Sequence, residues 1–243
     1  LQTLELFLER TGETDAEWPR GLLLKGEIEV QLASCDRALQ TLEKALELGK
    51  ERSQQEVVAR AAKGLGTGHF FLKNFETSTR FFRQSKEEYE ALSDPYEVAN
   101  CINNLGLAEL YQANLAEAES YFKDSLALHQ REGSLKGEGV ALGNLAGVSE
   151  QRGDSELAKS LFLESLGTLS RVGALWNCAY FLEGLGRALA SLKSLEKAVE
   201  CLAVAEALRL KLNTPRLPAE AQQYESLLCH LHEDCPTFKE SWD

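Results

Sequence analysis

The sequence predicts an all-α fold, a right-handed α-solenoid of antiparallel helix pairs with a period of 40 residues and a C-terminal helical cap. Three observations carry this prediction. Small residues recur every 40 positions, small and larger apolar residues follow them at fixed distances, and the turn inside each unit ends in a helix-capping residue.

The small residues stand in register without one insertion along the chain. The first column consists of Gly26, Gly66, Gly106, Ala146 and Gly186. Three further columns follow it at constant spacing: Ala38, Ser78, Ala118, Ala158 and Ala198; then Leu42, Phe82, Phe122, Phe162 and Leu202; then Ala45, Ser85, Ser125, Ser165 and Ala205. We expect the small residues to let the two helices of a pair approach, and the Leu or Phe column to fill the space between neighbouring pairs.

Within each unit the apolar residues recur at helical spacing, as in Leu105, Ala108 and Leu110. The turn between the two helices ends in a residue whose side-chain oxygen can cap the second helix. These predicted caps are Ser34, Asn74, Asn114, Asp154 and Ser194. Proline after Trp18 and after Asp94 marks the start of first helices, and Gly133 and Gly173 mark the ends of second helices.

In order along the chain, the predicted elements form one domain over residues 1–243. Residues 1–14 hold one helix of a partial N-terminal repeat. Five helical hairpins follow at 15–54, 55–94, 95–134, 135–174 and 175–213, and the capping helix and tail occupy 214–243. In that tail Pro215 and Pro218 bracket a loop, and Pro236 opens a short turn that carries Phe238 and Trp242.

The charge and hydropathy of the chain exclude several function classes. The formal net charge of −12 disfavours direct binding of nucleic acids and of anionic membranes. No apolar run approaches the roughly 20 residues that span a bilayer, and residues 1–14 do not show a basic segment followed by an apolar signal core. We expect a cytoplasmic protein whose six cysteines are mostly reduced.

The sequence lacks the motifs of a catalytic centre or a cofactor site. It contains no phosphate-binding loop, no dinucleotide fingerprint, no nucleophile elbow and no His-Glu-x-x-His. The glycines of 64–68 fall inside a predicted helix and indicate close packing. The best metal candidate is the set Cys229, His230, His232 and Cys235, for which packing of the cap is the alternative. We expect no enzyme, no cofactor and no metal.

The surface that could bind a partner is the concave groove lined by the first helices. Its candidate residues are Arg60, Lys63, Phe70, Phe71, Asn100, Asn103, Asn104, Tyr111, Asn144, Tyr180, Glu183 and Arg187. Asn104 and Asn144 occupy equivalent places, where an amide could clamp a ligand backbone or bond between repeats. The aromatic residues could anchor a bound segment or pack between helices.

The columns Leu105-Gly106, Ala118, Phe122 and Ser125 resemble the tetratricopeptide repeat (TPR), with a longer period than usual. Residues 135–243, with Leu185-Gly186-Arg187 and Ala205-Glu206-Ala207-Leu208-Arg209, resemble the C-terminal TPR-like region of bacterial signalling ATPases and LuxR-type transcriptional regulators. This resemblance implies a sensor domain that binds a protein, a peptide or a small ligand. It predicts a phosphate-binding loop upstream of Leu1, whereas the alternative, a free-standing TPR adaptor, predicts a chain that starts near Leu1.

Overall fold

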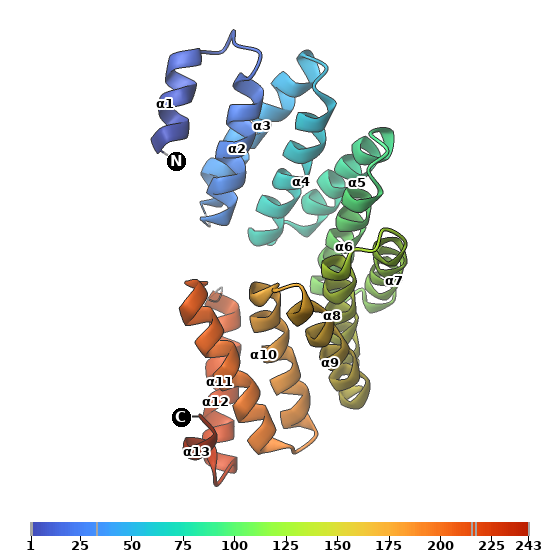
Figure 1. The fold of residues 1–243 in the computed structure, drawn as a ribbon, viewed down its shortest axis with the longest axis vertical. Coiled ribbons are helices and arrows are strands. Elements are labelled where there is room, and N and C mark those ends of the chain that lie inside the picture. The colour runs from blue at the N-terminus through green and yellow to red at the C-terminus, as the bar shows by residue number, and fades with distance from the viewer. Residues whose placement is uncertain (1, 33, 215, 217, 243) are drawn as a thin grey trace. The chain divides into compact units, whose positions relative to one another are not determined.

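The structure is a computed structural model that describes residues 2–32, 34–214, 216 and 218–242. Every regular element within these residues is a helix, and Figure 1 shows their order. The helices are α1 (Gln2–Thr11), α2 (Trp18–Gln31), α3 (Cys35–Glu51), α4 (Gln55–Phe71), α5 (Phe75–Ala91), α6 (Pro95–Tyr111), α7 (Leu115–Arg131), α8 (Leu135–Gln151), α9 (Ser155–Arg171), α10 (Leu175–Ser191), α11 (Leu195–Leu212), α12 (Pro218–Asp234) and α13 (Phe238–Trp242).

The contacts of the chain gather in two compact units, residues 1–124 and 125–243, where the sequence predicts one domain. In the N-terminal unit α2 packs on α3, α4 packs on α5, and each pair packs on the helix that follows it. In the C-terminal unit α8 packs on α9, α10 packs on both α9 and α11, and α11 contacts α12 and α13. These consecutive helix pairs confirm the predicted all-α fold.

The small column brings the two helices of a pair together as expected. A Cβ atom added to Gly66 would lie 2.6 Å from the ring of Phe82, and one added to Gly106 would lie 2.6 Å from the ring of Phe122. Gly26 faces Leu42 in the same way, at 2.5 Å. Real Cβ atoms do not approach other atoms so closely. Any larger residue at these positions would therefore force the neighbouring Phe or Leu side chain to move.

The larger column also fills the space between neighbouring pairs. Leu42 on α3 contacts Gly26 of its own hairpin and lies 2.9 Å from the position of a Cβ on Gly64, in the next hairpin. Gly68 faces Leu39 of α3 as well. The glycines of 64–68 therefore serve close packing of α4, as the sequence indicates.

Serines in the column of Ala45, Ser85, Ser125, Ser165 and Ala205 form hydrogen bonds in addition to allowing close packing. The Ser85 hydroxyl donates to the backbone carbonyl of Ala59 at 2.8 Å, and the Ser165 hydroxyl donates to that of Gly139 at 2.6 Å. Each bond crosses from the second helix of a hairpin to the first. Because both serines are buried, the bonds satisfy groups that would otherwise lack water.

The helix ends differ in part from the predicted caps. Asp154 accepts a hydrogen bond from the backbone amide of Leu157, but Ser34, Asn74 and Ser194 make no side-chain cap bond. The backbone still turns before Asn74 and Ser194, because Lys73 and Lys193, which precede these last residues of the turn, have positive φ. Glycine takes this place at 133, 153 and 173, and a residue with a side chain takes it at Ser53, Lys73, Ser93, Ala113 and Lys193.

The C-terminal segment packs on the last hairpin. The Tyr224 hydroxyl of α12 donates to the carbonyl of Leu202, and the rings of Phe238 and Trp242 stack 5.7 Å apart. The predicted loop residues Pro215 and Leu217 lie outside the described residues. Among the helices that the structure describes, none combines the length and the apolar character needed to cross a lipid bilayer.

Candidate functional site

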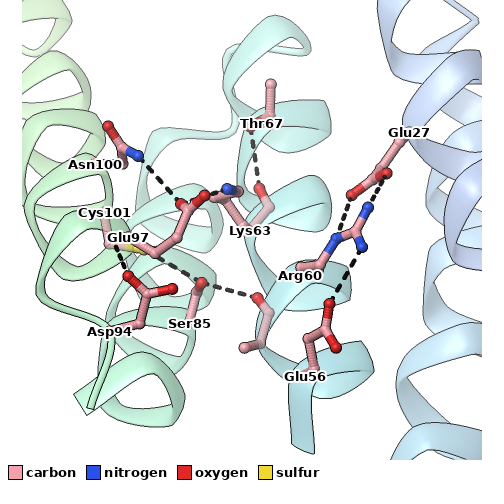
Figure 2. A network of polar contacts seen from close by, with 11 residues as sticks. Glu27, Glu56, Arg60, Lys63, Thr67, Ser85, Asp94, Glu97, Asn100 and Cys101 are labelled. Atoms are coloured by element: carbon pink, nitrogen blue, oxygen red, sulfur yellow. Dashed lines mark hydrogen bonds and ion pairs between the residues drawn. The ribbon is translucent and has the colours of Figure 1, made fainter. Parts of the chain in front are cut away.

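A network of charged side chains lies on the first helices of the N-terminal unit (Figure 2). Arg60 of α4 donates from Nε and Nη2 to the two carboxylate oxygens of Glu27 on α2, at 3.2 and 2.8 Å. Its Nη1 atom lies 3.5 Å from Glu56 of its own helix. The guanidinium therefore joins α4 to α2 with the two-pronged geometry that a carboxylate favours.

The network continues from α4 to α6. The Lys63 ammonium donates to Oε2 of Glu97 at 2.6 Å, and the Asn100 amide donates to the same oxygen at 3.2 Å. Asp94 caps α6 by accepting from the backbone amide of Glu97 at 3.0 Å. We call Glu27, Glu56, Arg60, Lys63, Glu97 and Asn100 the polar network.

The polar network borders a hollow of about 410 Å³. Its lining comprises Glu27, Glu56, Arg60, Lys63, Tyr89, Leu92, Asp94 and Glu97, so that four carboxylates face two cations. Burial lowers the pKa of Arg60, but its hydrogen bond to Glu27 and the charge of that carboxylate outweigh burial and raise it above its ordinary value. Burial, supported by the nearby charge of Glu97, raises the pKa of the Tyr89 phenol. The lining is thus a set of fixed charges with an excess of negative charge.

The thiol of Cys101 on α6 is buried beneath this surface and contacts Ser85 of α5. The Cys101 sulfur lies 3.3 Å from the Ser85 hydroxyl, which itself bonds to Ala59 of α4. Burial raises the pKa of Cys101 to about 11, although the bond to Ser85 opposes the shift. Cys101 is therefore a neutral packing group and no nucleophile at neutral pH.

An aromatic patch gathers where α4 and α6 end. We define it as Phe70, Phe71, Phe75 and Tyr111. The Phe70 ring meets Tyr111 edge-on at 5.0 Å and Phe75 edge-on at 5.6 Å. Phe71 and Tyr111 nevertheless leave 41% and 47% of their surface exposed. The patch therefore combines packing between helices with an exposed aromatic surface, the two roles that the sequence left open.

The predicted asparagines are placed differently from one another. Asn100 belongs to the polar network, whereas Asn103 and Asn144 are buried, with 8% and 5% of their surface exposed. Asn104 is half-buried. Asn104 and Asn144 share their repeat position with Gly64 and Gly184, which face the second helix of the preceding hairpin. This shared position favours a role between repeats over a clamp on a ligand.

The candidates on α10 lie in the C-terminal unit and have partners there. Arg187 donates to Glu150 of α8 at 2.6 and 3.1 Å, and Tyr180 stacks against Trp176. Glu183 is buried and holds Arg209 at 2.6 Å and Arg216 at 2.8 Å. Glu150 neutralises Arg187, and Glu183 neutralises one of the two arginines that it contacts. This part of α10 therefore lacks the excess of carboxylates found in the polar network.

The sequence prediction missed the carboxylates Glu27, Glu56 and Glu97. A signal for two of them was present. Glu27 precedes Arg60 by 33 residues, and Lys63 precedes Glu97 by 34. In a 40-residue repeat such a pair stands on successive first helices, offset by about two turns. Opposite charges at this separation therefore indicate an ion pair between repeats.

A larger hollow of about 850 Å³ lies over α5 and the end of α6. Its lining includes Arg80, Arg83, Glu87 and Glu109, and none of the residues that the sequence singles out for binding. The candidate metal ligands occupy ordinary positions in the cap: His232 packs against Phe238, and Cys229 is exposed while Cys235 is buried. Within the described part of the chain, no group of three or more His, Cys, Asp or Glu could hold a metal ion.

Comparison with known proteins identifies the repeat. The sequence profile of the tetratricopeptide repeat family matches residues 57–131 and 97–171. No curated protein sequence matches the chain. Solved structures do share its fold, although their sequence identity is too low to indicate more than the fold.

Three of the solved structures that share this fold have the following similarity to this chain. The BtubC (BKLC) protein of P. vanneervenii has a TM-score of 0.65 and 13% identity, over 89% of each chain. The STAND signal transduction ATPase with a tetratricopeptide repeat sensor, from Pyrococcus horikoshii, has a TM-score of 0.68 and 13% identity, over 98% of this chain and 40% of that one. A Rap protein complexed with competence and sporulation factor has a TM-score of 0.68 and 14% identity, over 98% of this chain and 68% of that one.

The sequence match and the paired helices agree with the resemblance seen in the columns around Gly106 and Phe122. Residues 57–171 therefore consist of tetratricopeptide repeats.

Proposed function

We propose that this chain is a non-catalytic binding domain that takes a peptide or a protein segment on the first-helix face of its N-terminal unit. One observation carries the proposal. Arg60, Lys63 and Asn100, chosen from the sequence as binding residues, converge with three carboxylates beside a hollow. Fixed charges on rigid helices select a ligand because their geometry does not have to be ordered on binding.

The fold neighbours support this class of function. A Rap protein is described in complex with competence and sporulation factor, and another Rap protein in complex with the Phr* peptide. The negative net charge of this chain supports a protein partner over a nucleic acid or an anionic membrane. The six free cysteines support a cytoplasmic location, where thiols stay reduced.

The proposed wider role is that of a sensor arm in a bacterial signalling or transcription-regulating ATPase. The STAND ATPase with a repeat sensor supports it, since 98% of this chain aligns with part of that protein. The alternative is a free-standing adaptor that binds a partner peptide without an ATPase. The mass and upstream sequence of the natural polypeptide decide between them. A phosphate-binding loop upstream of Leu1 supports the sensor, and a chain that begins near Leu1 supports the adaptor.

The binding function itself is tested with a displayed library of random peptides. We expect selected peptides to bind the purified protein and to change their affinity for the variant Arg60→Glu/Lys63→Glu, because this variant breaks the ion pairs with Glu27 and Glu97 and reverses two charges of the polar network. Lys159→Glu/Lys197→Glu, a charge reversal in the C-terminal unit, is the matched control. Failure to select any peptide, or equal binding by all three proteins, contradicts the proposal.

A further inference from the structure

The polar network and the aromatic patch lie on one continuous strip of α4. Eleven residues separate Arg60 from Phe71, close to three helical turns of about 3.6 residues each, so the two side chains leave nearly the same side of the helix. Glu56, one turn before Arg60, lies 15 residues from Phe71, and at a rise of about 1.5 Å per residue this separation is about 22 Å. Lys63 and Thr67 lie between them on this strip, and the Thr67 hydroxyl bonds back to the Lys63 carbonyl.

The neighbouring helix α6 carries the same arrangement. Glu97 and Asn100 stand near its start and Tyr111 is its last residue. Phe70 of α4 contacts Tyr111 of α6, so the aromatic ends of the two helices meet. The salt bridge between Lys63 and Glu97 joins their polar ends. The two helices together therefore present a surface that is charged at one end and aromatic at the other.

The charge at the polar end is negative once the internal pairs are counted. Glu27 neutralises Arg60, and Glu97 neutralises Lys63. The four carboxylates of the hollow outnumber its two cations, and the two in excess are Glu56 and Asp94. The Glu56 side chain is 59% exposed and lies at 3.5 Å from Arg60, a longer distance than that of Glu27. An acidic ligand would meet cations that already hold carboxylates, together with two further negative charges. A basic side chain would meet two carboxylates of complementary charge.

We propose that this surface takes an extended peptide segment that carries one lysine or arginine and, about seven residues away, one bulky apolar side chain. The basic group pairs with Glu56 and Asp94, and the apolar group lies on Phe71 and Tyr111. Seven residues of extended chain at about 3.3 Å each span the distance of about 22 Å between Glu56 and Phe71. This ligand class rests on the proposed binding function and adds its polarity and spacing.

The probes are four displayed peptide libraries that are random apart from two fixed positions. The first fixes lysine and phenylalanine about seven residues apart. The second replaces the lysine by glutamate, the third replaces the phenylalanine by serine, and the fourth brings lysine and phenylalanine within about two residues of each other. We expect the first library to be enriched most strongly, and its best peptide then serves for fluorescence anisotropy.

Variants of the protein assign each end of the peptide. We expect Glu56→Gln to weaken binding about twofold to fivefold, since exposed ion pairs are modest. Glu56→Lys should favour the peptide in which glutamate replaces lysine. Phe71→Ser should weaken binding at least about tenfold, as for an aromatic anchor. Tyr111→Ser repeats that test, and the melting temperature shows that each variant is folded.

Two matched controls lie in the C-terminal unit. Glu156→Gln removes an exposed glutamate that pairs with a cation one helical turn away, as Glu56 does, and Leu210→Ser removes an exposed apolar side chain. Both should bind like the natural protein. Enrichment of the glutamate library, or binding that ignores Glu56, Phe71 and Tyr111, overturns the ligand class but leaves the binding function standing. Failure of the four libraries and of the random library alike overturns both.

Discussion

Arg60 of α4 donates two hydrogen bonds to Glu27 of α2, in the preceding hairpin: Nε to Oε1 at 3.2 Å and Nη2 to Oε2 at 2.8 Å. The pair is partly buried, with 33% and 27% of the side chains exposed. It has two consequences. It ties α4 to α2, and it neutralises a cation that, considered alone, would suggest a site for an acidic ligand.

The first prediction concerns the energy of this pair. In a double-mutant cycle with Arg60→Ala and Glu27→Ala, we expect a coupling free energy of about 0.5–1.5 kcal/mol, because the pair is two-pronged and partly screened from water. Urea unfolding of the four proteins measures it. The exposed pair of Arg20 and Glu17 is the matched control and should show a smaller coupling. Equal coupling in both pairs would show that the bridge between hairpins adds no stability.

The second prediction concerns the small column. Gly106→Ala should lower the free energy of unfolding by about 1–3 kcal/mol, because its Cβ would lie 2.6 Å from the Phe122 ring. Phe122→Ala should cost about 3–5 kcal/mol through the cavity it leaves. Gly167→Ala is the control: no atom lies within 4 Å of its Cβ position, so it should stabilise α9 by about 0.5–1 kcal/mol. Destabilisation by Gly167→Ala equal to that by Gly106→Ala would contradict the packing argument.

The third prediction concerns the turn between α6 and α7. Ala113 has φ of 61°, a left-handed conformation that glycine adopts without a steric penalty. Ala113→Gly should therefore raise the free energy of unfolding by about 0.5–1 kcal/mol. The reverse change Gly153→Ala, at φ of 80°, should lower it by about 1 kcal/mol. Thermal and urea unfolding test both signs, and a loss of stability in Ala113→Gly would refute the argument.

The fourth prediction concerns alkaline pH. Burial raises the pKa of Cys101 to about 11 from its ordinary value of 9.0. Between these values the unfolded chain releases the thiol proton and the folded chain keeps it, so stability falls as pH rises from about 9 to 11. Cys101→Ala should reduce this slope, whereas the exposed Cys229→Ala should not. Unfolding free energies measured across this pH range decide the point, and an unchanged slope in Cys101→Ala would exclude the thiol as its source.

The sequence by itself determined the paired helices and their packing. Gly66 and Phe82 stand at fixed places in a 40-residue period, and every unit must bury the same faces against its neighbours. A repeated local pattern therefore fixes repeated local contacts. It also indicated Arg60, Lys63 and Asn100 as binding candidates, because these polar residues lie on first helices away from the packing columns.

Only the tertiary structure decided which charges remain available. Glu27 and Glu97 are more than 30 residues from their partners, and the packing of successive hairpins brings them to Arg60 and Lys63. Likewise, Asn103 resembles Asn100 in the sequence, yet Asn103 is buried and Asn100 donates a hydrogen bond to Glu97 of the polar network. Helical periodicity fixes the direction in which a side chain leaves its own helix. The partners that it meets depend on how neighbouring helices cross, and that geometry arises only when the hairpins pack.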